Sequence, residues 1–310
     1  MTRPKVSIIG AGAVGTATAH WLAQKSIADI VLTDIIEGLP EGKALDIQQA
    51  GPIAGFDVRL TGTSRGYEDT AGSAVIVITA GIPRKPGMTR EQLIDTNAGI
   101  LRHVIDQVVP RSRTAVFIIL TNPLDAMTYL ACKVAGLPRE RILGQSGALD
   151  TTRFRTFLAM ELGVSVGDVD AMVIGAHTDK DMVPLASLAN VRGIPVRTLL
   201  PPERLEAVVA RTRRGGAEIT ELMKQSGFTA AGAALVEMIE AVLLDRRRVI
   251  PCSVYLDGEY GQRDICIGVP VIVGAGGVER ILDAPLTDAE RQAFTASVAV
   301  VREMLASLKI

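Results

Sequence analysis

The chain has 310 residues, which is more than one typical folding core holds and suits two domains. Its formal net charge of −1 leaves no basic surplus, so we expect neither a nucleic acid nor an anionic membrane surface as a partner. Three widely spaced cysteines, Cys132, Cys252 and Cys266, favour a reducing compartment over a disulfide framework or a zinc site.

Short β-branched runs alternate with segments of helical period in the first half of the chain. We predict strands at 6–9, 30–33, 58–60, 75–78 and 115–120, and helices at 14–25, 41–50 and 91–109. This alternation predicts right-handed βαβ crossovers and an α/β fold with a doubly wound, Rossmann-type parallel sheet. Ligands of such sheets bind beyond the carboxyl ends of the strands.

The pattern changes after residue 144. We predict a helix at 148–162, strands at 169–174 and 182–188, helices at 202–224 and 230–244, strands at 249–255 and 265–273, and a helix at 288–308. A glycine cluster at 274–277 indicates a turn. We therefore expect a cofactor-binding domain at 1–145 followed by an α+β substrate-binding and catalytic domain at 146–310, with no flexible linker between them.

The N-terminal segment and the apolar runs do not predict export or membrane insertion. The segment 1–5 leads directly into a strand-like run without the pattern of a signal peptide. The longest uncharged apolar stretch, 265–278, is shorter than the roughly 18 residues that indicate a membrane span. We expect a cytoplasmic protein.

A glycine-rich turn follows the first predicted strand and opens a helix; it consists of Gly10, Ala11, Gly12, Ala13, Val14 and Gly15. In this context it predicts a dinucleotide site, because its glycines allow a tight turn, close approach of a pyrophosphate and close helix packing. Asp34 ends the second strand, where a carboxylate can bind ribose hydroxyls and repel a 2′-phosphate. We predict NAD rather than NADP. A turn without a ligand is the alternative, but it does not explain Asp34.

His177 directly follows the apolar run 173–176. Histidine is suited to take a hydroxyl proton as hydride leaves and to return it in the reverse direction. A lone histidine is more often structural, yet Asp150 and Arg153 share one face of a predicted helix among apolar or small neighbours. A buried carboxylate could orient the histidine, and a guanidinium could grip a substrate carboxylate. The alternative is an exposed Asp–Arg pair of little energetic weight.

The loop after the fourth predicted strand carries three cations, Arg84, Lys85 and Arg90. Thr89 and Gln92 have the spacing of a capping box, which predicts a helix that begins at Arg90. Cations are disfavoured in the first turn of a helix, so these charges indicate an external anion; a solvated basic loop is the alternative. Asn122 follows the fifth strand, where it could bind a substrate oxygen or the nicotinamide, or be an ordinary turn asparagine.

Together these segments resemble the lactate and malate dehydrogenase superfamily, and within it the bacterial malate dehydrogenases built like lactate dehydrogenases. The resemblance covers essentially the whole chain, in the family's order and spacing, through GAGAVG, the strand-end Asp34, ITAGIPRKPGMTR, TNPLDAMTYL, GQSGALDTTRFR and IGAHTDKDMVP. It implies an oxidoreductase of the tricarboxylic acid cycle that interconverts L-malate and oxaloacetate with NAD, and a homodimer or homotetramer.

The resemblance also implies roles for individual residues. His177 would be the proton acceptor and Asp150 its orienting partner, while Arg153 would hold the C1 carboxylate of the substrate. Arg90 would polarise the reacting carbonyl from a mobile loop, and Asn122 would bind the same region. Arg84 would contact the distal carboxylate; lactate enzymes usually carry glutamine there. We assign further cofactor contacts to Thr79, Ala80, Gly81, Asn97, Thr121 and Asn122.

The sequence departs from the family pattern directly after the histidine. The family usually has Gly, an acidic residue, one variable residue and then Met-Val-Pro, whereas Thr178-Asp179-Lys180-Asp181 precedes Met182 here. The loop is one residue longer and lacks the glycine, so we expect an altered local backbone. The resulting His-x-Asp-x-Asp string could be read as metal ligands, but no further ligands are evident and we expect no metal.

Two other functions stay open at this point. One is an L-lactate or other 2-hydroxy-acid dehydrogenase of the same fold, which the residue at position 84 would distinguish. The other is a non-catalytic dinucleotide-binding regulator. Such a regulator would need the glycines and Asp34, but it would have no need of His177, Asp150 and Arg153 together.

Overall fold

The structure is a computed structural model that describes residues 3–83 and 87–309. A parallel sheet forms the first half, in the order β3-β2-β1-β4-β5-β6. Its strands are β1 (Lys5–Ile9), β2 (Asp29–Thr33), β3 (Leu60–Thr63), β4 (Val75–Ile78), β5 (Val116–Ile119) and β6 (Ile142–Gly144). This is the strand order of a doubly wound dinucleotide-binding sheet, so the predicted fold class is confirmed.

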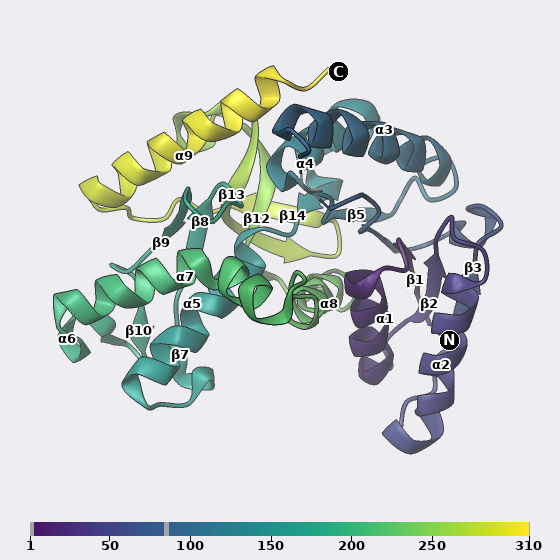
Figure 1. Cartoon of the computed structure of the whole chain (residues 1–310), viewed down its shortest axis with the longest axis horizontal. Coiled ribbons are helices and arrows are strands. Elements are labelled where there is room, and N and C mark those ends of the chain that lie inside the picture. Colours follow the sequence, from purple (N-terminus) through teal and green to yellow (C-terminus); the bar gives the residue numbers. More distant parts are fainter. Residues whose placement is uncertain (1–2, 84–86, 310) are drawn as a thin grey trace.

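Helices cover both faces of this sheet (Figure 1). One face packs against α3 (Arg90–Val108) and α4 (Leu124–Val134); the other packs against α1 (Ala13–Lys25), α2 (Leu39–Ala54) and, from the second half of the chain, α8 (Thr229–Leu243). Alternate residues of strand β4 pack into the apolar clusters on the two opposite faces of the sheet. Val75 and Val77 of β4 join one apolar cluster, while Ile76 and Ile78 join the other. Burial on both faces explains why these strands are continuously apolar.

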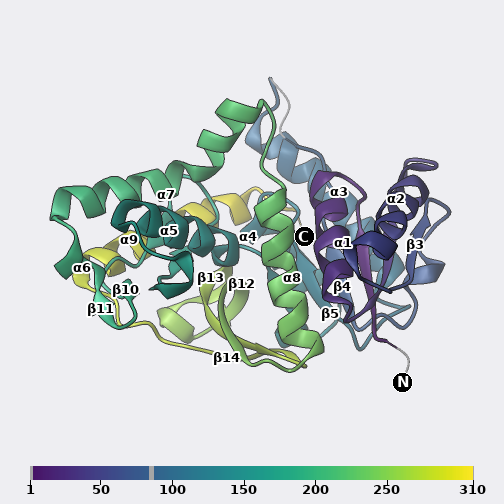
Figure 2. The same cartoon turned by 90° about the horizontal axis from the view of Figure 1, so that it is seen from below.

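The second half extends the same sheet with antiparallel strands. Its elements are α5 (Gly147–Leu162), β7 (Val169–Asp170), β8 (Val173–Gly175), β9 (Met182–Pro184), β10 (Asn190–Val191), β11 (Ile194–Pro195), α6 (Val196–Leu199), α7 (Pro202–Met223), α8, β12 (Arg248–Asp257), β13 (Arg263–Gly274), β14 (Gly277–Ile281) and α9 (Asp288–Ala306). The long hairpin β12–β13 pairs with β6 on one side and β8 on the other, while β7, β10 and β11 form a small separate sheet. Figure 2 shows α5, α7 and α9 gathered at the end away from β3.

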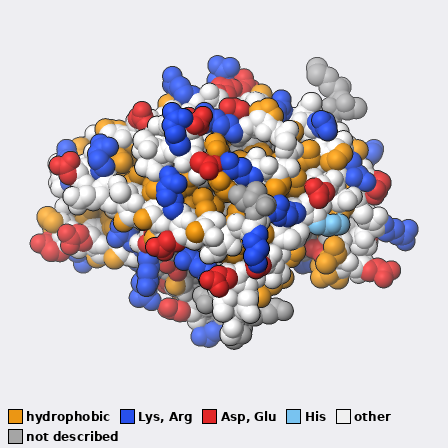
Figure 3. Space-filling view, turned by 90° about the horizontal axis from the view of Figure 1, so that it is seen from above, with side chains coloured by type: hydrophobic (Ala, Val, Ile, Leu, Met, Phe, Trp, Pro, Cys, Tyr) orange, Lys and Arg blue, Asp and Glu red, His pale blue; other side chains and the backbone are white. Residues whose placement is uncertain are grey.

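Short 3₁₀ turns complete the described structure: η1 (Glu68–Thr70), η2 (Arg139–Arg141), η3 (Val166–Asp168) and η4 (Glu259–Gly261). In the part of the chain that is described, no helix is long and apolar enough to cross a membrane. The face seen in Figure 3 carries acidic and basic side chains interspersed, with hydrophobic side chains toward its middle.

Several predicted elements differ from the structure. The strand expected at 58–60 is wrong, because the side chain of Gln48 binds the carbonyl of Val58 and the N–H of Leu60, and the strand starts only at Leu60. The run at 169–174 is divided between β7 and β8, which belong to different sheets. The turn predicted at 274–277 is confirmed as the connection from β13 to β14.

Helix α4 was not predicted, and its burial explains why. Every residue from Leu124 to Ala131 is buried, so the polar stripe that marks a surface helix is missing. The predicted helix at 91–109 is confirmed. It begins at Arg90, with Thr89 and Gln92 exchanging both hydrogen bonds of the capping box.

Helices α1 and α8 approach closely at Gly232. A Cβ atom at this position would lie 2.9 Å from the backbone nitrogen of Thr18 and 2.9 Å from the Cβ of Ala17. Because backbone cannot yield as a flexible side chain can, the two helices would have to separate.

We therefore expect Gly232→Ala to lower the free energy of unfolding in urea by about 1–3 kcal/mol. Gly99→Ala is the matched control, since Gly99 is exposed on α3 and nothing lies within 4 Å of its added Cβ. That variant should gain about 0.5–1 kcal/mol from helix propensity. Equal effects of the two substitutions would contradict close packing of α1 on α8.

Candidate active site

The loops that follow β1, β2, β4 and β5 carry the predicted cofactor residues. Gly10 has a φ of 113°, and a Cβ there would lie 2.6 Å from the Oγ1 of Thr79. A Cβ on Gly15 would clash with the carbonyl oxygen of Gly10. Gly12 caps the N-terminus of α1 and has open space around its Cα, so a phosphate can approach the free N–H groups there. The turn thus fits the diphosphate of a dinucleotide.

Asp34 connects the end of β2 to the glycine-rich turn. Its carboxylate accepts hydrogen bonds from the N–H of Ala11 at 2.7 Å and the N–H of Ile36 at 3.1 Å. The carboxylate therefore lies beside the turn, where it can meet a ribose. Sequence reasoning missed Ile35, whose side chain follows Asp34 and is 86 % exposed. Such an exposed apolar side chain at a cofactor edge offers a surface for a flat aromatic base.

Asn97, Thr121 and Thr79 lie behind the loops and hold them in place. Asn97 is buried; its amide binds both backbone groups of Ile82 and the carbonyl of Asn122. The hydroxyl of Thr121 donates to the carbonyl of Ala80 at 2.6 Å, and that of Thr79 lies 3.1 Å from the carbonyl of Gly10. Direct contacts between these side chains and a cofactor stay predictions.

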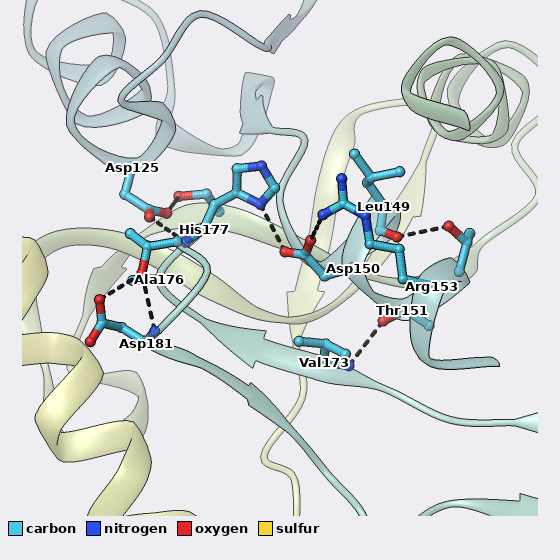
Figure 4. A network of polar contacts seen from close by, with 12 residues as sticks. Asp125, Leu149, Asp150, Thr151, Arg153, Val173, Ala176, His177 and Asp181 are labelled. Atoms are coloured by element: carbon cyan, nitrogen blue, oxygen red, sulfur yellow. Dashed lines mark hydrogen bonds and ion pairs between the residues drawn. The ribbon is translucent and has the colours of Figure 1, made fainter. Parts of the chain in front are cut away.

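His177, Asp150 and Arg153 come together at the start of α5 and the end of β8 (Figure 4). The two oxygens of Asp150 serve different partners. Oδ2 lies 2.7 Å from Nδ1 of His177, and Oδ1 accepts a hydrogen bond of 2.8 Å from an Nη of Arg153. The side chain of Asp150 is only 2 % exposed. With Nδ1 donating to Asp150, Nε2 of His177 is the ring nitrogen left to exchange a proton with a ligand.

The pKa of His177 is raised above its ordinary value. Burial opposes the charged ring and alone would lower the pKa, as does the nearby Arg153. The charge and hydrogen bond of Asp150, with a further contribution from Asp125, outweigh both effects. The site therefore favours a protonated imidazole more than water does.

Arg153 keeps part of its guanidinium available. Its Nε is buried and has no hydrogen-bond partner among the described residues. A buried donor without a partner is costly, and the 16 % of the side chain that is exposed is the part that a carboxylate can reach. Gly215 and Gly216 of α7 make room for this side chain, since a Cβ on Gly216 would lie 3.4 Å from the Nη2 of Arg153. Adjacent glycines inside a long predicted helix were the missed sequence signal.

A cavity of roughly 520 Å³ opens in front of His177. Arg90 from the first turn of α3 and Asn122 from the loop after β5 line it together with the loop 178–181. The structure thus brings His177, Arg90 and Asn122 around one space, with Asp150 and Arg153 beside the ring. Arg84 and Lys85, which were also predicted to meet an anion, lie outside the described residues.

The longer loop after His177 closes on itself. The hydroxyl of Thr178 donates to the carboxylate of Asp181 at 2.6 Å and accepts from the N–H of Asp181 at 3.1 Å. Asp179 and Lys180 point outward as exposed residues at the cavity rim. Within 3–83 and 87–309, no group of three or more His, Cys, Asp or Glu side chains is arranged to hold a metal ion.

Asp125 is a residue of the site that sequence reasoning did not single out. It lies in the first turn of α4, is buried, and accepts a hydrogen bond of 2.8 Å from the backbone N–H of His177. Its other oxygen accepts from the hydroxyl of Ser253 at 2.6 Å. A carboxylate within the otherwise uncharged segment 124–131 was the available signal.

Comparison with known proteins gives relatives over the whole chain. Residues 4–144 match the family described as lactate/malate dehydrogenase, NAD binding domain, and residues 147–309 match the lactate/malate dehydrogenase alpha/beta C-terminal domain. A malate dehydrogenase of Roseiflexus sp. (strain RS-1) is 55% identical over 308 residues, which cover 99% of each chain.

Solved structures agree with this. The apo malate dehydrogenase of Picrophilus torridus superposes with a TM-score of 0.95 at 45% identity, covering 98% of this chain and 97% of that chain. A lactate dehydrogenase of Cryptosporidium parvum, complexed with lactic acid and NAD, superposes with a TM-score of 0.94 at 39% identity, covering 99% of this chain and 98% of that chain.

The raised pKa of His177 predicts a pH-dependent contribution to stability. Because the pKa is higher in the folded than in the unfolded chain, the protonated ring stabilises the fold fully below about pH 6.5, and this contribution is lost as the pH rises through the folded pKa. His177→Gln should therefore lower the free energy of unfolding more at pH 5.5 than at pH 9. His103→Gln, on the exposed face of α3, is the control. A loss for His177→Gln that is equal at both pH values would contradict the pairing with Asp150.

Proposed function

Because the chain belongs to the lactate/malate dehydrogenase family, we propose that it is an NAD-dependent L-malate dehydrogenase that interconverts L-malate and oxaloacetate. The observation that carries the proposal is the shared Asp150 carboxylate, which orients a proton-transferring ring and a carboxylate-binding guanidinium toward one place. A dinucleotide-binding regulator would have no use for that arrangement.

The residues divide the reaction between them. Arg153 binds the C1 carboxylate of malate through the donors that Asp150 leaves available. His177 takes the C2 hydroxyl proton on Nε2, and Asp150 stabilises the resulting imidazolium. Arg90 and Asn122, at the cavity wall, face the C2 oxygen and polarise it when the reaction runs in reverse. NAD⁺, when bound, supplies the nicotinamide that accepts the hydride from C2.

We attribute the choice of malate over lactate to Arg84, from its position in the sequence. Oxaloacetate and pyruvate differ only at C3. Oxaloacetate carries a carboxylate on this carbon, whereas in pyruvate the carbon is a methyl group. A guanidinium pairs with the carboxylate and is left without a partner when pyruvate binds. Sites that depend on such a pair can discriminate by about 10⁴-fold.

Arg84→Gln should therefore lower kcat/KM for oxaloacetate strongly while pyruvate reduction rises from its low level. Arg153→Gln is the matched control, because the C1 carboxylate is common to both substrates and both activities should fall together. Steady-state rates of NADH oxidation measure this. An unchanged oxaloacetate-to-pyruvate ratio in Arg84→Gln would remove the main support for malate and favour a 2-hydroxy-acid dehydrogenase of other specificity.

The choice of cofactor is tested at Asp34. Replacing it by Ser removes a negative charge and a ribose acceptor beside the glycine-rich turn. Asp34→Ser should erode the preference for NADH over NADPH in kcat/KM, mainly through a gain with NADPH. A wild-type protein that already uses both cofactors equally would contradict this role of Asp34.

Assembly, location and domain division are also proposals. We propose a homodimer or homotetramer, which is supported by Leu45 and Ile53 of α2, exposed apolar side chains of which the latter is 93 % exposed. The cytoplasm is supported by three free thiols, Cys132, Cys252 and Cys266. We further propose that residues 1–145 bind NAD and residues 146–310 bind the substrate and carry the proton-transferring histidine.

A further inference from the structure

A second carboxylate, that of Asp125, contacts the residue that moves the proton. The ring of His177 is bound by Asp150 from α5, whereas its backbone is bound by Asp125 from α4. The neighbouring Ala176 donates its N–H to the hydroxyl of Ser297 at 2.7 Å. Residues of α4, α5 and α9 thus hold His177 and its neighbour Ala176 in place. Of these three residues, Asp125 is the one within the segment that matches the NAD-binding family domain.

The two oxygens of Asp125 have separate hydrogen-bond donors. Each oxygen accepts one hydrogen bond, from the N–H of His177 and from the hydroxyl of Ser253. A backbone N–H can only donate, and an ionised carboxylate can accept from it and from the hydroxyl at the same time. The first turn of α4 adds the partial positive charge of a helix N-terminus. Burial outweighs the hydrogen bonds from Ser253 and His177, so the pKa of Asp125 is raised above its ordinary value.

A buried charge at this place acts on the ring as well as on the backbone. Asp125 is buried at the wall of the cavity, so its field on His177 is less screened by solvent than that of an exposed carboxylate. The charged groups facing His177 are Asp150 and Arg153 of α5, Asp125 of α4, Arg90 of α3, and Asp179, Lys180 and Asp181 of its own loop. Of these, Asp125 and Asp150 are the buried carboxylates.

We propose that Asp125 is a positioning residue for the dehydrogenase reaction: its ionised carboxylate holds the backbone of His177 in place and favours the imidazolium form of the ring. The effect of Asp125 on catalysis rests on the proposed function. Its effect on the position and protonation of His177 does not. This positioning role would couple proton transfer to the position of α4, which begins directly after the loop that carries Asn122.

The decisive variant is Asp125→Asn, which can keep both hydrogen bonds. Its Oδ1 can accept from the N–H of His177, while its Nδ2 donates to the hydroxyl oxygen of Ser253. Only the charge is lost. The His177 ring is followed by NMR in protein labelled with ¹⁵N-histidine; the chain has three histidines, and His177→Gln assigns the signal. We expect the titration midpoint of His177 to fall by about one pH unit, a tenfold change in proton affinity.

Ser253→Ala is the matched control, since it removes one hydrogen bond of Asp125 and leaves the charge. Its midpoint should not fall. An Asp125→Asn midpoint equal to that of the wild type would overturn the proposal. If Asp125→Asn does not fold, the protonation state of Asp125 is measured in the wild type from the ¹³C chemical shift of its carboxyl group. A protonated carboxyl at pH 7 would equally overturn the proposal.

The pH dependence of kcat/KM provides a second test, because a purely structural role of Asp125 would not change it. Oxaloacetate reduction requires protonated His177. The kcat/KM of Asp125→Asn relative to wild type should therefore be about tenfold lower one pH unit above the wild-type NMR midpoint than one pH unit below the midpoint of the variant. An equal loss at both pH values indicates a packing defect and contradicts the charge effect. The NMR titration needs no substrate. A wild type inactive toward oxaloacetate, with a lowered midpoint in Asp125→Asn, would therefore refute the malate assignment and leave the role of Asp125 intact.

Discussion

The buried carboxylate of Asp150 is the interaction on which the rest of the site depends. One oxygen fixes His177 and the other fixes Arg153, at 2.7 and 2.8 Å. A single negative charge thereby sets the tautomer and proton affinity of the ring and aims the guanidinium. Because the side chain is almost fully buried, removing either partner would leave one carboxylate oxygen without a hydrogen bond in a low-dielectric surrounding. The proposed acid–base group and the proposed substrate-binding group thus share one anchor.

The sheet brings this anchor to the cofactor. Parallel strands β1, β2, β4 and β5 end at one edge, which places the glycine-rich turn, Asp34 and Asn122 on the same side. Strand β6 then pairs with β12, and β13 pairs with β8, which ends just before His177. The predicted cofactor-binding edge and the proposed proton acceptor, His177, therefore belong to one continuous sheet. Asp125 adds a direct hydrogen bond between the two parts.

Local patterns predicted the fold and most of the site. The glycine-rich turn, the Thr89 capping box and the Asp150–Arg153 spacing each express a short-range rule, and each feature is present in the structure. Features set by tertiary packing were missed: α4 lacks a polar face, Gln48 displaces the start of β3, and Asp125 acquires its partners from residues 52 and 128 positions away. No local pattern encodes a hydrogen bond between segments so distant in the chain.

The assignment as an L-malate dehydrogenase is tested most directly by NAD⁺ reduction with the purified wild-type protein. Rates are measured with L-malate and with L-lactate as the only hydroxy acid, under identical conditions. Discrimination through the distal carboxylate predicts a kcat/KM for L-malate that exceeds that for L-lactate by about 10⁴-fold. Comparable values for the two acids, or a preference for L-lactate, would contradict the assignment.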